Sequence, residues 1–427
     1  MENMQMYIVL AITIFMIASF LIGKWPYGLT TMTCCALLGI TGVMDPVAAF
    51  GGVANKTTIL IAGMFVVAYA FGKTSLITRI RKQMEKIKGK NGLALMLFLF
   101  VITIVLCQLM GRTAVLSIMI LFISSLDEAD EMSPSRMITA CFAMIAIWNF
   151  KFPIAMGATM APTANAMYEG IISDPNLMLG TWDFFKVSII PGIALTIYTL
   201  LFWKLIPSHP VDTSNVKDVA AAKISKKDEI CISVVFIGVM IAFFMGTKIG
   251  NLMHVAPAIG ALVLLITKSL TTKEVIDKLT GDMTWMIAGV LVMSDAMGQS
   301  GVGELIGDGI LSVLGSTPNG ILVLFVFGLT SIVMTTFMSN TGTQAILTPI
   351  AASMALAGGM DPRGLVLMVQ IGAVMAIAFP SGSAECALMF AAGRHNPVGL
   401  LKFTIPFLIL ALITLTFSIN LFFPVYG

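Results

Sequence analysis

Apolar segments of about 20 residues, the length that a helix needs to cross the hydrocarbon core of a bilayer, recur along this sequence between residues 6 and 423. Few charges interrupt them, because only 11% of the 427 residues are charged. Soluble domains carry about 25% charged residues, so this chain cannot cover an ordinary water-facing surface. The sequence therefore predicts an all-α polytopic membrane protein, and it excludes a soluble enzyme, a nucleic-acid-binding protein and a secreted disulfide scaffold.

Two apolar stretches, 92–126 and 319–350, are too long for one span. Each has a polar kink at its middle, formed by Gly111, Arg112 and Thr113 in the first and by Ser339, Asn340 and Thr341 in the second. Each stretch forms either two spans or a re-entrant helical hairpin that enters the bilayer and returns on the same side. We take the hairpin as the prediction.

Two other segments, 136–172 and 364–392, would be about 55 Å and about 43 Å long as straight helices, against about 30 Å of hydrocarbon. Both contain a cluster of Pro, Gly, Ser and Thr, at 157–165 in one and at 380–383 in the other. Proline and glycine interrupt helices, so we expect two broken helices whose unwound middles face the kinks.

The chain also repeats itself. Residues 61–72 resemble residues 287–298 at an offset of 226, and the two polar kinks lie at an offset of 228. Each half then holds three spans, a hairpin and two spans, and this odd number of crossings inverts the second half relative to the first. We predict a first repeat at 1–206, a cytoplasmic linker at 207–229 and a second repeat at 230–427. Such inverted repeats are typical of secondary transporters, whose substrate site lies near the midplane where the interruptions meet.

Basic residues support this topology, because Lys and Arg gather on cytoplasmic loops. Most of the 25 Lys and Arg residues fall on the cytoplasmic side of the membrane when the loops at 73–90, 204–227 and 268–278 are cytoplasmic. Treating either kinked stretch as two spans would leave the later loops on the same sides, so this pattern does not by itself prove re-entrancy.

The second kink predicts a cation site. Asn and Thr oxygens, with carbonyls freed by a break, suit a small hard cation such as sodium, and helix N-termini facing them suit a carboxylate. The alternative is that these polar residues only satisfy a turn. The predicted anion site comprises Gly111, Arg112, Thr113, Thr159, Ser339, Asn340, Thr341, Ser381, Gly382 and Ser383. The predicted coupling-ion site comprises Ser339, Asn340, Gly342, Pro380 and Glu385, with Ser339 and Asn340 as the sodium ligands.

Four charged residues lie inside apolar segments, where an ionisable group is costly unless it is paired or wet. Arg112 stands at the first kink. Glu385 lies just past the second break, where a carboxylate could bind a cation or carry a proton. Lys151 either faces the substrate anion or extends to an interface, and Asp295 is a charge partner or a solvated capping residue.

At this point the residues resemble the divalent anion/sodium symporter family, in which each repeat carries a hairpin with a Ser/Asn-Asn-Thr motif and a broken helix. Ser339, Asn340 and Thr341, with 345–349 after them, look like the second hairpin of that family. The resemblance implies a homodimeric elevator-type transporter of di- or tricarboxylates in a bacterial inner membrane, with no cofactor other than sodium at each hairpin tip.

The first hairpin departs from the family pattern, because Arg112 stands where relatives have asparagine. Two cations about 4 Å apart repel by about 4 kcal/mol at an effective dielectric constant of about 20, so Arg112 and sodium would not share one tip. We therefore predict reduced or no sodium coupling at the first site, with exchange or proton coupling instead.

Three alternatives remain open at this point. The first is a sodium-coupled symporter of another anion such as sulfate, and the second is an ion channel. The third is a membrane-embedded enzyme, but the sequence has neither an HExxH nor a Gly-x-Ser-x-Gly motif.

Overall fold

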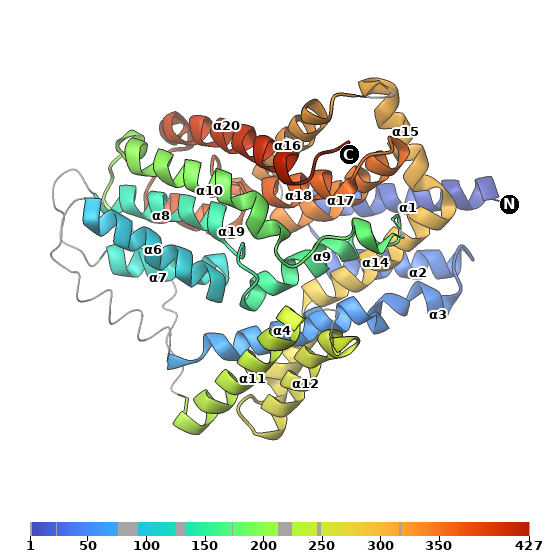
Figure 1. Ribbon diagram of the computed structural model, residues 1–427, viewed down its shortest axis with the longest axis horizontal. Helices are drawn as coiled ribbons and strands as arrows, with labels where there is room; N and C mark the ends of the chain where they lie inside the picture. Colours follow the sequence, from blue (N-terminus) through green and yellow to red (C-terminus); the bar gives the residue numbers. More distant parts are fainter. Residues whose placement is uncertain are drawn as a thin grey trace.

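The computed structural model of the chain describes residues 2–22, 24–75, 93–124, 133–172, 174–211, 224–245, 249–315, 318–337 and 339–426. Every regular element in these ranges is a helix (Figure 1). Much of the basic loop at 73–90 and residues 212–223 of the predicted linker lie outside the described residues.

The first half of the chain contains the following helices: α1 (Glu2–Ile22), α2 (Tyr27–Ile40), α3 (Pro46–Ala49), η1 (Gly51–Ala54), α4 (Lys56–Gly72), α6 (Leu93–Leu109), α7 (Arg112–Ile123), α8 (Pro134–Trp148), η2 (Ala155–Thr159), α9 (Met160–Ala166), η3 (Pro175–Leu177), α10 (Asp183–Phe202) and η4 (Trp203–Leu205). The second half contains α11 (Lys226–Met245), α12 (Leu252–Ile266), α13 (Thr272–Leu279), α14 (Asp282–Ser300), α15 (Val302–Leu314), α16 (Gly320–Phe337), α17 (Asn340–Ala357), α18 (Pro362–Gly372), η6 (Pro380–Gly382), α19 (Ala384–Ala392) and α20 (Pro397–Phe422). Both α13 and α15 lie in segments that hydropathy alone treats as loops.

Three helices among the described residues are long and apolar enough to cross a bilayer, at Asp183–Leu205, Gly320–Phe337 and Pro397–Phe422. Several shorter apolar helices accompany them, including α2, α4 and α8. On α20, large apolar side chains at every fourth position, such as Ile409, Ile413 and Phe417, are more than half exposed. A stripe of this kind suits lipid rather than water, so the chain is an integral membrane protein.

Both kinked stretches double back on themselves. Limbs α6 and α7 pack against each other and both pack on α8, while α16 and α17 pack against each other and both pack on α18. Figure 1 shows α6 and α7 lying side by side. Gly111 precedes the first turn of α7, and Ser339 caps α17 by accepting a hydrogen bond from the Gly342 amide at 3.0 Å. The helix N-termini of α7 and α17 therefore stand at the two tips, as the sequence predicts.

Both predicted helix breaks are present, but the first begins earlier than the sequence indicates. Helix α8 ends at Trp148, shortly before Pro153, which has no amide proton to donate to a continuing helix. The backbone turns with positive φ at Phe150 (56°) and Ala155 (52°), a costly conformation for residues with a Cβ atom. Pro162 falls in the first turn of α9, where an amide is not needed.

Glycine makes the first break tight. A Cβ atom on Gly157 would lie 1.9 Å from the Phe152 carbonyl oxygen, so only glycine fits there. The second break runs from the end of α18 through 373–379 and η6 to α19. A Cβ atom on Gly382 would lie 2.6 Å from the Ala376 Cβ atom, so this loop is also closely packed.

The helices pack in two groups. In the first group, α1, α2, α4, α11, α12, α13 and α14 contact one another, with α4 against α12 and α2 against α14. The second group comprises the two hairpins, the two broken helices, α10 and α20. Helix α15 connects the groups, following α14 in the chain and packing on α17. In Figure 1 the first group includes α4, α11 and α12 at the bottom of the view, and α8, α10, α19 and α20 of the second lie above them.

Candidate functional site

Arg112 begins α7 at the first hairpin tip, but its guanidinium reaches residues of the second half of the chain. The Nη1 atom lies 3.2 Å from Glu385 Oε1, and Nη2 donates to the Val374 carbonyl at 2.7 Å. The side chains of Arg112 and Glu385 are only 11% and 10% exposed. This is a buried, charge-assisted ion pair between the first tip and the second break.

Asn340 at the second hairpin tip completes this arrangement. With its amide oxygen facing the guanidinium, it accepts from Arg112 Nη1 at 2.6 Å. The amide nitrogen then donates to Thr335 Oγ1 at 2.7 Å and to the Ala373 carbonyl at 2.9 Å. Three oxygens from three segments thus surround one guanidinium: the Asn340 amide, the Val374 carbonyl and the Glu385 carboxylate.

These are the types of oxygen that would ligate a hard cation at the second tip. The sequence assigned Asn340 and Glu385 to a coupling ion, and it placed the fixed charge of Arg112 at the first tip. In the structure the Arg112 guanidinium instead donates to the oxygens that were predicted to bind this ion, those of Asn340 and Glu385. Arg112 Nε is buried without a hydrogen-bond partner among the described residues.

Ser339 at the second tip contacts the first group of helices. Its hydroxyl forms a short hydrogen bond with the Tyr27 hydroxyl, while it also caps α17. The Tyr27 and Gly28 amides in turn donate to the Asp282 carboxylate, at 3.2 Å and 2.8 Å. The N-terminus of α2 therefore positions a hydroxyl directly at a hairpin tip.

The other predicted site residues occupy the tips and the breaks. Thr341 and Gly342 lie in the first turn of α17, and Thr113 lies in the first turn of α7. Ser383 accepts from the Cys386 amide at 3.1 Å and caps α19. Ser381 donates to the Thr336 carbonyl at 2.8 Å, which joins η6 to the end of α16. Pro380 and Gly382 complete η6, and Thr159 ends η2 with its hydroxyl turned back to the Met156 carbonyl.

Lys151 and Asp295 are not partners of each other. Lys151 lies in the first break with its Nζ atom 5.9 Å from the centroid of the Phe184 ring. Asp295 lies on α14 against the chain after α9, where a Cβ atom on Gly170 would be 2.3 Å from the Asp295 amide nitrogen. On the same helix, a Cβ atom on Gly298 would lie 2.1 Å from the Gly170 carbonyl oxygen. The two groups of helices are thus closely packed at this end of α14.

At the opposite end of α14, a cavity of about 770 Å³ separates the two groups of helices. Gly111 and Ala114 of the first tip line it on one side, and Tyr69, Lys73 and residues 281–283 line it on the other. Lys278 and Asp277 also line it, so charged groups stand along its walls. A volume of this size accommodates a small organic anion with its water.

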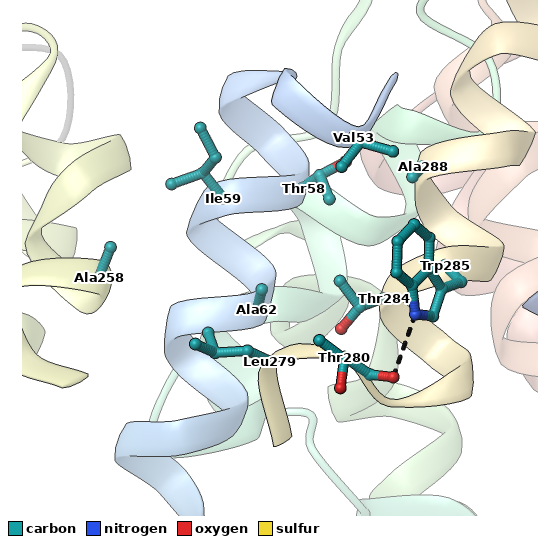
Figure 2. Close-up of a pocket in the computed structure, with 10 residues that line it drawn as sticks. All are labelled: Val53, Thr58, Ile59, Ala62, Ala258, Leu279, Thr280, Thr284, Trp285 and Ala288. Atoms are coloured by element: carbon teal, nitrogen blue, oxygen red, sulfur yellow. Dashed lines mark hydrogen bonds between the residues drawn. The ribbon is translucent and has the colours of Figure 1, made fainter. Parts of the chain in front are cut away.

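A smaller cavity of about 250 Å³ lies within the first group, between α4, α12 and α14 (Figure 2). Its walls are mostly apolar, and Trp285 Nε1 beside it donates to the Thr280 carbonyl at 3.1 Å. The residues that line it include none from either hairpin or either break. This smaller cavity is therefore separate from the contacts of Arg112 with Asn340, Val374 and Glu385.

Comparison with known proteins shows the family. The citrate transporter (CitMHS) family model matches residues 17–372 and 255–425. The chain belongs to this family. One relative, the sodium-dependent dicarboxylate transporter SdcS of Staphylococcus saprophyticus, is 23% identical over 90% of this chain and 80% of its own length. Another, the putative malate transporter YflS of Bacillus subtilis, is 27% identical over 66% of this chain and 62% of its own length.

A solved structure supports the fold. The YdaH transporter of Alcanivorax borkumensis superposes with a TM-score of 0.64 at 12% identity, covering 93% of this chain and 96% of that chain. The family model and the relative SdcS confirm the sequence resemblance to the divalent anion/sodium symporters. The family comprises transporters rather than enzymes.

Three residues of the site were not predicted from the sequence. Val374 acts through its main-chain carbonyl, which no side-chain motif reveals. Tyr27 is one of six tyrosines, and only the packing of α2 against α14 brings it to the second tip. Thr335 had a usable signal, because it precedes the polar kink by about one helical turn and therefore lies on the face of α16 that approaches it.

Proposed function

We propose that this protein is a secondary transporter of small carboxylate anions, most specifically di- or tricarboxylates, in which the Arg112 guanidinium replaces a sodium ion at the second hairpin tip. The anion binds between the two tips and the two breaks. The observation that carries the proposal is the contact of one guanidinium with Asn340, Val374 and Glu385. The dicarboxylate and malate transporters among the relatives support the substrate class.

We further propose the inverted repeats and the domain boundaries that the sequence predicts. The order of hairpin, broken helix and long helix occurs at α6–α10 and again at α16–α20. In an elevator movement, these elements would slide as one body along the first group of helices, which stays fixed. Packing of the helices in two groups supports this division.

In this proposal, the structure corresponds to the state in which the site opens to the cytoplasm. Lys73 and Lys278, which line the 770 Å³ cavity, belong to the basic side of the membrane. At the other end of α14, the backbone contact between Gly170 and Gly298 leaves no room for a passage. A small anion would therefore leave or enter past Lys73.

Electrostatics argues against sodium at the second tip. A sodium ion would have to share its oxygens with a guanidinium that stays protonated at physiological pH. Repulsion of about 4 kcal/mol at about 4 Å opposes that arrangement. We therefore propose transport without sodium at this tip, by a homodimer in a bacterial inner membrane.

Uptake into proteoliposomes tests the proposal. Counterflow of radiolabelled di- and tricarboxylates, with sulfate as a competing anion class, should show saturable and temperature-sensitive flux for carboxylates, and the flux should be the same with and without sodium. Arg112→Asn should lose sodium-independent transport, because Asn340 and Glu385 then lack their cation. Arg363→Asn is the matched control, since Arg363 pairs with Asp361 outside the site. Strict dependence of the wild type on two or more sodium ions would refute the built-in cation.

A further inference from the structure

The smaller cavity of the first group, between α4, α12 and α14, contains a buried hydroxyl without a partner. Its volume is about 250 Å³, larger than the roughly 150 Å³ that holds benzene in an apolar protein interior. Thr284 lines this cavity and is only 9% exposed, and in Figure 2 it lies on the side of α14 that faces α4. The Thr284 Oγ1 atom has no hydrogen-bond partner among the described residues.

The neighbouring residues explain why this hydroxyl is free. A threonine within a helix can donate to the carbonyl four residues earlier, as Thr336 does at 2.8 Å and Thr404 does at 3.3 Å. For Thr284 that carbonyl belongs to Thr280, which precedes α14 and accepts from Trp285 Nε1 at 3.1 Å (Figure 2). The indole therefore takes the acceptor that the Thr284 hydroxyl would use.

The other hydroxyl protons of the cavity wall are committed, and this defines the chemistry of a ligand. Thr58 donates to the Gly52 carbonyl at 2.7 Å, and Thr280 donates to the Ile276 carbonyl at 2.9 Å. Water is a poor occupant of mostly apolar walls, because it needs two or more polar partners. One free proton beside apolar walls suits a group that only accepts a hydrogen bond and carries a hydrocarbon chain, which is the chemistry of an acyl ester.

The depth of the cavity also fits a lipid. Thr284 lies in the first turn of α14, two residues after Asp282, and a charged residue of a membrane-spanning segment belongs near the water boundary. Tryptophan is enriched at that boundary, and Trp285 stands there beside Thr284. Trp285 and Ile59 are each 38% exposed, so the cavity is accessible from outside the helices. The ester groups of a phospholipid lie at the same boundary, and its chains extend inward.

We propose that the smaller cavity binds one acyl chain of a bilayer phospholipid, with the ester carbonyl accepting a hydrogen bond from the Thr284 hydroxyl. An ether-linked lipid has the same chain but no carbonyl, so it would leave Thr284 unsatisfied. The site should therefore prefer an ester lipid to its ether analogue by about fivefold, the effect of one hydrogen bond. This preference does not depend on which anion the protein transports.

Quenching of Trp285 fluorescence tests the proposal. The protein is reconstituted in unbrominated ether phosphatidylcholine with increasing fractions of a phosphatidylcholine that is brominated on one chain, because bromine quenches nearby indoles. The chain has five tryptophans, so the Trp285 signal is taken as the difference between the wild type and Trp285→Phe. The brominated ester lipid should reach half of its maximal quenching at an approximately fivefold lower fraction than the brominated ether lipid.

Three variants, each compared with its own Trp285→Phe counterpart, separate the hydroxyl from the shape of the cavity. Thr284→Val keeps the shape and removes the hydroxyl, so the two brominated lipids should quench equally. Thr284→Ser keeps the hydroxyl and should keep the ester preference. Thr267→Val is the matched control, because it removes a hydroxyl that donates to the Val263 carbonyl at 2.8 Å outside the cavity, and it should also keep the preference.

The wild type alone can overturn the proposal, even if Thr284→Val does not fold. Equal quenching by the ester and ether lipids would mean ordinary contact with the bilayer and no built site. Absence of Trp285 quenching by either lipid would mean that another occupant, such as a second copy of the chain, closes the cavity. An ester preference that persists in Thr284→Val would refute the role of the hydroxyl. Carboxylate transport is tested separately by counterflow, so either proposal can fail without the other.

Discussion

Removing the negative charge of Glu385 should destabilise the empty protein, and the structure sets the size of the effect. At the 3.2 Å separation from Arg112, two unit charges attract by about 5 kcal/mol at an effective dielectric constant of about 20. Breaking one partner of a buried pair costs about 3–5 kcal/mol, because the other charge stays buried and uncompensated. The hydrogen bonds from Arg112 to Val374 and Asn340 remain in the Glu385→Gln variant. We therefore expect this substitution to lower the free energy of unfolding by about 3 kcal/mol, the lower end of that range.

A double-mutant cycle on thermal unfolding in detergent measures this coupling. Glu385→Gln and Arg112→Gln should each lower the midpoint temperature by about 5 °C, and the double variant should recover much of the loss. Succinate should raise the midpoint more in Glu385→Gln than in the wild type, because its carboxylate can replace the lost charge. The ion pair of Arg112 and Glu385 would be refuted if Glu385→Gln unfolded at the same midpoint temperature as the wild type. It would also be refuted if the loss in the double variant equalled the sum of the two single losses.

Two further outcomes follow from the geometry. Cysteines at Thr113 and Thr341, in the first turns of α7 and α17, should both be protected from thiol reagents by a bound dicarboxylate, and protection of neither would remove these tips from the anion site. Between the end of α4 and the start of α13, a hydrogen bond from Lys73 lowers the pKa of Glu274 to about 2. This carboxylate therefore stabilises the fold above its ordinary pKa of 4.5, and that contribution is lost as the pH falls toward 2. The midpoint of the wild type should therefore fall more steeply with acid between those values than that of Glu274→Gln, and parallel curves would contradict this.

The sequence by itself determined the class of fold and the positions of its interruptions. Apolar runs with few charges have one stable outcome in a bilayer, because every backbone amide must be satisfied within a helix. Breaks are then favoured where glycine, proline and small polar residues gather, and both hairpin tips and the second break occur at such clusters. The first break begins after Trp148, before its cluster at 157–165, so the sequence indicated its position only approximately. The repeated motifs at a nearly constant offset also indicated a transporter.

Only the tertiary structure decided which groups meet. Arg112 looked like a charge for its own tip, yet its guanidinium binds Asn340, Val374 and Glu385, all more than 220 residues later in the chain. The position of Lys151 over the Phe184 ring was equally invisible, because it depends on how the first break packs against α10. Hydropathy reports local burial along a helix, whereas the pairing of buried charges depends on the packing of segments distant in sequence, and that packing brings the two tips of this transporter together.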